Sequence, residues 1–226
     1  DIVDPALFPH VGWAFAGGVA SGPLALVFLP FLERLWNTAS AFRLLKYADL
    51  DSPLLKELLT TAPGTYQHTM TAAHFAQVAA EAIGANTLLV RVGAYYHDIG
   101  KTIEPRHFVE NQFGGLNPHD HLAPEESTRI VIDHVKNGLR LGREAGLPQA
   151  ILDFIPQHHG TLLVEYFCDK ARKSSGNGQV EEARFRYPGP KPRSVETAIL
   201  MITDAVEAAS RSLHEPSGEK IDAMVR

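Results

Sequence analysis

This chain has a single cysteine and no excess of basic charge. Cys168 is the only cysteine among 226 residues, which excludes an intramolecular disulfide and a thiolate metal cluster. The net charge of −5 offers no broad basic surface, so we expect no nucleic-acid polymer as a partner. A small anionic substrate is compatible with this charge, because a bound metal supplies local positive charge.

Charge of either sign is also missing near the start of the chain. No residue from Pro5 to Leu32 is formally charged, and residues 11–31 would make an apolar stretch of about bilayer length. Basic residues follow the stretch, which places the downstream side in the cytoplasm. We therefore expect 1–36 to be a transmembrane helix of a longer protein, and the family resemblance given below implies that it is the last one. The alternative is a surface or core helix of a soluble domain.

Helical patterns dominate the remainder. Residues 37–61 predict a leucine-rich connector helix, with Asp51-Ser52-Pro53 as a helix start inside it. Pro63-Gly64 interrupts the chain, and helices are then expected over 66–84, 88–100, 124–146, 149–160 and 194–213. The sequence predicts an all-α domain over 62–226.

The dipeptide His97-Asp98 has the chemistry of a metal centre. A carboxylate has two oxygens, so one aspartate can bridge two metal ions about 3.5–4 Å apart. Such a pair is weak evidence alone, but more histidines follow on successive helices. Asp204 adds to them, because aspartate in an apolar stretch is rarely buried unless it is paired or binds a metal. The candidate ligands are His68, His97, Asp98, His134, His158, His159 and Asp204.

These donors favour phosphate chemistry at two metal ions. Nitrogen and oxygen ligands rich in histidine suit iron, manganese, zinc or nickel better than magnesium or calcium. Two divalent ions, two aspartates and a hydroxide leave a charge of about +1, which complements a phosphodiester. Lys101, three residues beyond Asp98, is expected to contact the phosphate or the leaving oxygen. The alternative is a solvated lysine that closes a helix.

Short motifs around these residues resemble the HD superfamily of phosphohydrolases. More narrowly, they resemble the PgpH-type phosphodiesterases, which have seven transmembrane helices and a cytoplasmic HD domain. The similarity runs over 44–225, and the motifs that carry it are Ala62–His68, His97–Lys101, Phe108–Gln112, Asn117–Asp120, Gln157–Thr161 and Arg186–Pro192.

The resemblance implies a fold, a reaction and a location. The fold would be an HD-domain helical bundle with a di-metal centre. The reaction would be hydrolysis of cyclic di-AMP to linear pApA in second-messenger signalling, and the protein would lie in a bacterial cell membrane with this domain in the cytoplasm.

The resemblance also assigns the candidate ligands to the two metal ions. His68, His97 and Asp204 would hold one metal, Asp98 would bridge, and His134, His158 and His159 would hold the second, with iron or manganese bound. Asp98 and Lys101 would be the catalytic residues. The residues expected beside the substrate are Asn111, Gln112, Tyr187 and Arg193.

Other functions stay open at this point. The domain could be another HD hydrolase that acts on cyclic di-GMP, (p)ppGpp or a dNTP, or a catalytically silent nucleotide-sensing module. The cyclic di-GMP branch carries Gly-Tyr-Pro after its His-Asp pair, where this chain has Thr102–Pro105. Four further polar residues in the loop at 105–124 are expected to face solvent, namely His107, His119, Asp120 and His121.

Overall fold

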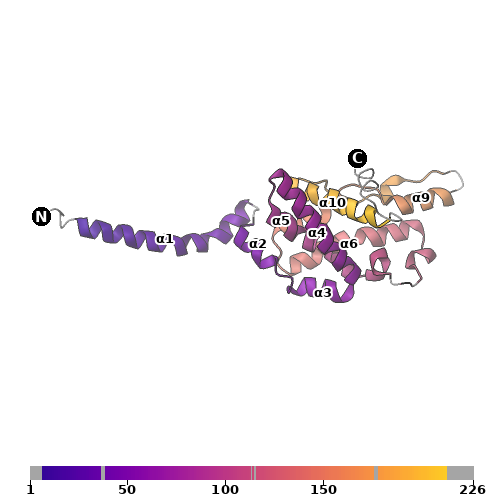
Figure 1. The fold of residues 1–226 in the computed structure, drawn as a ribbon. Coiled ribbons are helices and arrows are strands. Elements are labelled where there is room, and N and C mark those ends of the chain that lie inside the picture. Colours follow the sequence, from indigo (N-terminus) through magenta and orange to yellow (C-terminus); the bar gives the residue numbers. More distant parts are fainter. Residues whose placement is uncertain (1–6, 37–38, 113, 115, 176–177, 213–226) are drawn as a thin grey trace. The chain divides into compact units, whose positions relative to one another are not determined.

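The structure is a computed structural model that describes residues 7–36, 39–112, 114, 116–175 and 178–212 (Figure 1). The chain divides into two units after Ser40, and each is described by itself. The first unit contains α1 (Leu7–Trp36), in which residues Pro9–Glu33 form a candidate membrane span with a mean hydropathy of 1.8. At about 1.5 Å per residue such a helix is long enough to cross the bilayer core. Its apolar side chains are exposed, which suits association with a membrane.

The second unit begins with two helices where one connector helix was expected over 37–61. These are α2 (Ala41–Tyr47) and α3 (Pro53–Thr61). Between them, the side chain of Asp49 accepts a hydrogen bond from the backbone N–H of Asp51 at 2.9 Å. This local turn takes the place of a helical hydrogen bond. Pro53 has no N–H to donate to a preceding carbonyl, so α2 cannot continue through it as one helix. The prediction of one connector helix is wrong for this reason, whereas the helix start expected at Asp51-Ser52-Pro53 is confirmed, because α3 begins at Pro53 with Ser52 as its N-cap.

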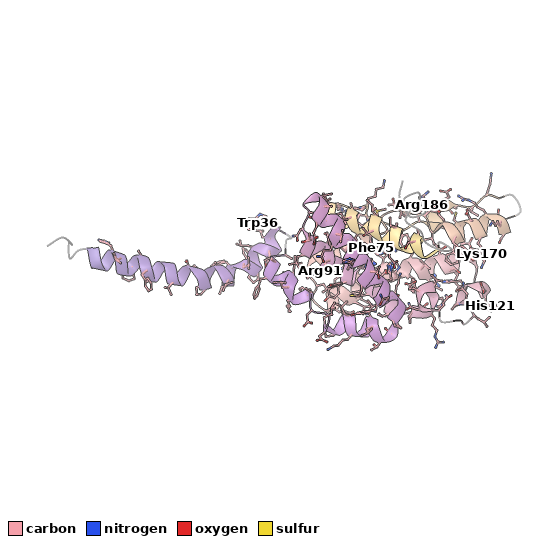
Figure 2. All side chains as sticks on the ribbon, viewed as in Figure 1. Trp36, Phe75, Arg91, His121, Lys170 and Arg186 are labelled. Atoms are coloured by element: carbon pink, nitrogen blue, oxygen red, sulfur yellow. The ribbon has the colours of Figure 1, made fainter. Side chains whose placement is uncertain are left out.

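The core lies between α4 (Pro63–Ile83), α5 (Thr87–Tyr96) and α10 (Val195–Ser212), which pack side by side (Figure 1). Small residues permit this close approach, because α4 contributes buried alanines to a cluster with Phe154 and Leu200. Gly93 on α5 lies against the Phe154 ring, where a Cβ would overlap the ring atoms. Phe75, labelled in Figure 2, is on the partly exposed side of α4.

The remaining elements surround this core. The loop expected over 105–124 contains three short 3₁₀ turns, η2 (Pro105–His107), η3 (Val109–Asn111) and η4 (Pro118–His121). One helix was expected over 149–160, and the structure has α7 (Gln149–Leu152) and α8 (Phe154–Gln157) there. The other elements are η1 (Ile99–Thr102), α6 (Pro124–Glu144), α9 (Glu165–Ser174) and η5 (Glu182–Phe185).

The predicted all-α class is confirmed. Within the described ranges, extended pairing is limited to a single bridge between Leu163 and Arg186. Cys168 is buried on α9, in a cluster with Phe167 and Phe185.

Candidate metal centre

The seven candidate ligands come together from separate elements of the second unit. His68 lies on α4, the His97-Asp98 pair joins α5 to η1, and His134 lies on α6. The pair His158-His159 follows α8, and Asp204 lies on α10. Three overlapping groups of these side chains have ligand atoms within 4.8 Å of one another: Asp98, His134, His158 and His159; His68, His97 and Asp98; and His97, His158 and Asp204.

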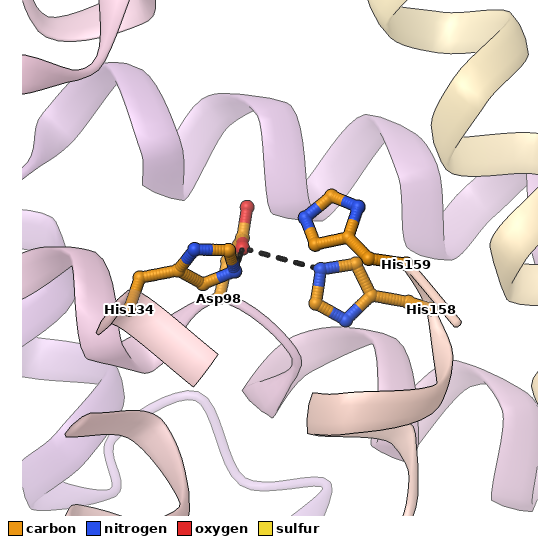
Figure 3. A group of neighbouring side chains, drawn as sticks. All are labelled: Asp98, His134, His158 and His159. Carbon is orange, nitrogen blue, oxygen red and sulfur yellow. Dashed lines mark ion pairs between the residues drawn. The ribbon is translucent and has the colours of Figure 1, made fainter. Parts of the chain in front are cut away.

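Asp98 lies at the centre of the cluster, and its two carboxylate oxygens face different histidines. Oδ1 is 3.4 Å from His134 Nε2 and 3.7 Å from His158 Nε2 (Figure 3). Oδ2 is 3.3 Å from His97 Nε2 and 3.7 Å from His68 Nε2. One oxygen is thus available to each of two cations, as the bridging role predicted for Asp98 requires.

Asp204 completes the group around Oδ2. Its Oδ1 lies 2.9 Å from His68 Nε2 and 3.5 Å from His97 Nε2. The apolar residues around Asp204 on α10 bury this carboxylate, as the sequence predicted.

Backbone carbonyls orient three of the histidines. Nδ1 of His97 donates to Ala94 O at 2.6 Å, Nδ1 of His134 to Val131 O at 2.5 Å, and Nδ1 of His158 to Phe154 O at 3.0 Å. A carbonyl can only accept, so Nδ1 carries a proton, and in the neutral ring Nε2 presents a lone pair to the cluster. Metal-binding histidines usually have their second nitrogen fixed in this way.

Five of the atoms aimed into the cluster have no hydrogen-bond partner among the described residues. They are buried, and an unsatisfied buried polar atom costs about 1–3 kcal/mol. Bound cations would satisfy all of them at once, so the donor set fits divalent metal ions. These atoms are Nε2 of His97, His134 and His158 and Oδ1 of Asp98 and Asp204.

The charges in the cluster keep several ligands in the form that a metal needs. Burial opposes ionisation of Asp98, but Lys101 and His97 outweigh it and hold the pKa of Asp98 well below its usual range. Burial, together with the charge of His97, lowers the pKa of His158 to about 3. Two histidines are exceptions. Burial lowers the pKa of His97, but Asp98 and Asp204 raise it to about 10, and at His68 the hydrogen bonds to Asp204 and Glu207 outweigh burial and raise the pKa as well. The carboxylates of Asp98 and Asp204, which could hold a cation, also stabilise a proton on His97.

Lys101 lies between two carboxylates at the edge of the cluster. Its Nζ is 2.7 Å from Asp98 Oδ2 and 2.9 Å from Glu110 Oε1, and the side chain is 13% exposed. Burial disfavours its charge, but the two carboxylates raise the pKa of Lys101, which is therefore a cation at neutral pH. The alternative of a solvated lysine closing a helix is wrong, because these carboxylates hold the side chain inside the protein.

A pocket of about 450 Å³ opens beside the cluster. It is large enough to admit a small polar ligand to the candidate ligands. The pocket is lined by His68, Lys101, Val109, Glu110, His159, Asp204, Glu207 and Ala208.

The residues expected beside the substrate differ in their surroundings. Tyr187 stacks on His159 with ring centroids 4.1 Å apart and an angle of 22° between the rings. Asn111 is buried, and its amide is bonded at both ends to protein atoms. It accepts from Thr65 N at 3.1 Å and donates to Thr65 Oγ1 at 2.8 Å and to Pro105 O at 3.2 Å. This leaves the Asn111 side-chain amide without a free N–H donor and favours a role for Asn111 in holding the loop at 105–124 in place.

The other two expected substrate residues lie in more open positions. The Gln112 amide donates to Arg106 O at 3.1 Å, and Arg193 is exposed. The substrate roles of Asn111, Gln112, Tyr187 and Arg193 stay predictions.

One expectation for the loop histidines is wrong. His119 is 4% exposed, and its Nε2 donates to His107 O at 2.9 Å while its ring packs against Phe167 on α9. Because α9 covers η4, His119 is a buried structural residue. His121, labelled in Figure 2, is exposed as expected, and so is Asp120.

Sequence reasoning missed two acids, the partly buried Glu110 and the buried Glu207. Glu110 binds Lys101 and also accepts from Thr65 Oγ1 at 3.0 Å. Glu207 Oε2 lies 2.5 Å from His68 Nδ1. The available signal for Glu207 was its position three residues after Asp204, which puts both acids on one face of a helix.

The arrangement of histidines and aspartates can be compared with known proteins. Residues 65–209 match the family model of the HD domain. The chain belongs to the HD-domain family. The HD-domain prediction is confirmed, and the motif resemblance to the PgpH type is confirmed by the relatives that the chain matches.

Two curated relatives are the cyclic-di-AMP phosphodiesterases PgpH of Listeria monocytogenes serotype 1/2a (strain 10403S) and Bacillus subtilis (strain 168). This HD-domain chain is 47% identical to the first over 215 residues and 46% identical to the second over 209 residues. These matches cover 95% and 92% of the chain but only 30% and 29% of the relatives. The chain thus spans less than a third of the length of these proteins.

A solved structure is also similar. The crystal structure of the L. monocytogenes phosphodiesterase PgpH HD domain in complex with cyclic-di-AMP has 51% sequence identity and a TM-score of 0.75. The match covers 78% of this chain and 82% of that chain.

Proposed function

We propose that this chain is the catalytic part of a phosphodiesterase that hydrolyses cyclic di-AMP to linear pApA. The observation that carries the proposal is Asp98, which offers one carboxylate oxygen to each of two groups of histidines beside a pocket of about 450 Å³. The cyclic di-AMP named for the similar crystal structure supports the choice of substrate.

The donor set supports two divalent ions, and we propose iron or manganese. When bound, such ions lower the pKa of a water molecule and neutralise charge on the phosphate oxygens. We propose His68, His97 and Asp204 as ligands of one ion, His134, His158 and His159 as ligands of the other, and Asp98 as the bridge between them.

The chemistry needs one water for each bond opened. Water adds to phosphorus, the bond from phosphorus to the ribose oxygen breaks, and the proton from water passes to the leaving oxygen. The ring opens to a linear dinucleotide with a terminal phosphate.

The chain's own side chains prepare this step. Asp98 fixes the spacing of the two ligand groups, and the backbone carbonyls hold the histidine rings in place without further reorganisation. The Lys101 ammonium lies 2.7 Å from Asp98, at the wall of the pocket, where it can donate to a phosphate oxygen or to the leaving oxygen. Discrimination for adenine would come from hydrogen bonds to the base edge, which guanine would leave unpaired.

The location in the cell is part of the same proposal. The length and apolar composition of α1 support its assignment as the last transmembrane helix, with the HD domain in the cytoplasm of a bacterial cell.

The test is hydrolysis of cyclic di-AMP and cyclic di-GMP side by side at equal concentration with Mn(II) or Fe(II), together with (p)ppGpp and dNTPs. We expect pApA as the product and much slower turnover of the other nucleotides. Asp98→Ala purified in parallel controls for contaminating hydrolases. Equal rates on both dinucleotides, or a preference for cyclic di-GMP, would refute the substrate. Binding without turnover by the metal-loaded protein would instead favour a nucleotide-sensing module.

A further inference from the structure

His68 differs from the neighbouring histidines in how its ring is held. His97, His134 and His158 each use Nδ1 to reach a backbone carbonyl. His68 Nδ1 instead lies 2.5 Å from Oε2 of Glu207, a side chain of α10 that is 4% exposed. A carboxylate therefore takes the place that a neutral carbonyl has at the other rings.

Burying Glu207 needs a compensating interaction, because an isolated buried carboxylate is costly. The short contact with His68 provides one, since hydrogen bonds to a charged acceptor are about twice as strong as neutral ones. Glu207 cannot donate while it is ionised, so Nδ1 of His68 must carry the proton. Nε2 of His68 lies 2.9 Å from Asp204 Oδ1 and faces the cluster, so it is the nitrogen that a cation could take.

The helix geometry couples this contact to a candidate ligand. Glu207 follows Asp204 by three residues on α10, so the two carboxylates lie on one face and approach the two nitrogens of one imidazole. His134, His158 and His159 do not share this contact in the described part of the chain. Loss of Glu207 should therefore affect one ligand group and spare the other.

We propose that Glu207 is a positioning residue, which holds His68 in the tautomer and orientation that bind a cation with His97 and Asp204. The inference rests on the proposed di-metal centre but not on the identity of the nucleotide. Removing an orienting partner of a histidine ligand typically weakens metal binding about 10–100-fold.

The test is a Mn(II) titration of the full chain in detergent, followed by calorimetry and by electron paramagnetic resonance. Glu207→Met removes the acceptor with little change in volume, while Glu207→Gln keeps an oxygen that can accept from Nδ1. Glu196→Met is the matched control, because Glu196 is an acid of the same helix whose carboxylate accepts from Asn86 N at 3.3 Å.

We expect the wild-type chain and Glu196→Met to bind two Mn(II) ions with the spectrum of a coupled pair. In Glu207→Met one ion should bind about 10–100-fold more weakly and the spectrum should become that of a single ion. Glu207→Gln should stay close to wild type. If Glu207→Met does not fold, Glu207→Asp, whose carboxylate is one methylene shorter, replaces it with the same expectation.

Unchanged Mn(II) affinity in a folded Glu207→Met protein would overturn the proposal. Equal weakening of both ions, or a Glu207→Gln variant as weak as Glu207→Met, would overturn it as well. A wild-type chain that binds two ions but does not open cyclic di-AMP would refute the proposed substrate alone, so the two failures are distinguishable.

Discussion

Lys101→Met tests most directly whether the Lys101 ammonium stabilises negative charge on the phosphate. The substitution keeps much of the side-chain volume but removes the ammonium, which lies 2.7 Å from Asp98 Oδ2 and 2.9 Å from Glu110 Oε1. Removing one donor that stabilises a developing negative charge typically costs a factor of about 10²–10³ in kcat. Lys101 already shares its charge with two carboxylates, which reduces what it can give to the substrate. We therefore expect kcat to fall by about 10–1000-fold, or about 1.4–4 kcal/mol.

The assay is steady-state hydrolysis of cyclic di-AMP at saturating Mn(II), with the metal content of each protein measured in parallel. An interaction made only in the transition state lowers kcat and leaves KM nearly unchanged. Lys170→Met is the control, because Lys170 on α9 also has a protein partner, His119 O at 3.1 Å, outside the metal cluster. The reasoning is refuted if kcat stays within twofold of wild type in a folded, metal-loaded variant.

Stability must be followed in the same experiment. Removing one partner of a buried ion pair can cost about 3–5 kcal/mol, and Glu110 would keep only its hydrogen bond from Thr65. A thermal melt should show a lower Tm for Lys101→Met than for Lys170→Met. Kinetics are then compared well below both transitions, so that loss of fold is not read as loss of catalysis.

Three further results are expected. Asp98→Ala should abolish hydrolysis and lower the content of both metals, because both ligand groups share this carboxylate; retention of a tenth of the rate with bound metal would contradict the bridge. Tyr187→Leu should weaken metal binding through His159 by about 0.5–1.5 kcal/mol, the usual value of an aromatic pair, while Tyr187→Phe keeps the stack. Equal metal content in both Tyr187 variants would rule out that contribution. Deleting residues 1–36 should leave activity intact and improve solubility in activity and sedimentation assays, and loss of the folded domain would refute the membrane assignment of the segment.

The sequence predicted the candidate ligands because their residue types and their order along the chain indicate metal binding. Histidines inside apolar helices and an aspartate in an apolar stretch are conspicuous, since burial of such groups needs a partner. The HD-domain fold could be predicted from the same motifs. The start of α3 at Pro53 could be predicted as well, but the end of α2 before Asp49 could not, because a single side-chain hydrogen bond forms the turn there.

The missed residues depend on packing between distant segments. Glu110 and Glu207 look like ordinary surface acids in the sequence. Glu110 is partly buried and Glu207 is buried because each meets a partner from another element. His119 was misread for the same reason, since α9 follows it by more than forty residues and covers its ring. Tertiary contacts of this kind produce no local pattern in the amino-acid sequence.

Gly100 has a consequence for how the site tolerates change in its surroundings. A Cβ there would overlap the carbonyl oxygen of His134, so the turn that carries Asp98 rests directly on the main chain of α6. The spacing between Asp98 and His134 is therefore set by contact of two backbones and not by the size of any side chain between them. Conservative changes in the nearby core, for example Ile155→Val, would lower the free energy of unfolding by about 0.5–1.5 kcal/mol and leave that spacing unaltered.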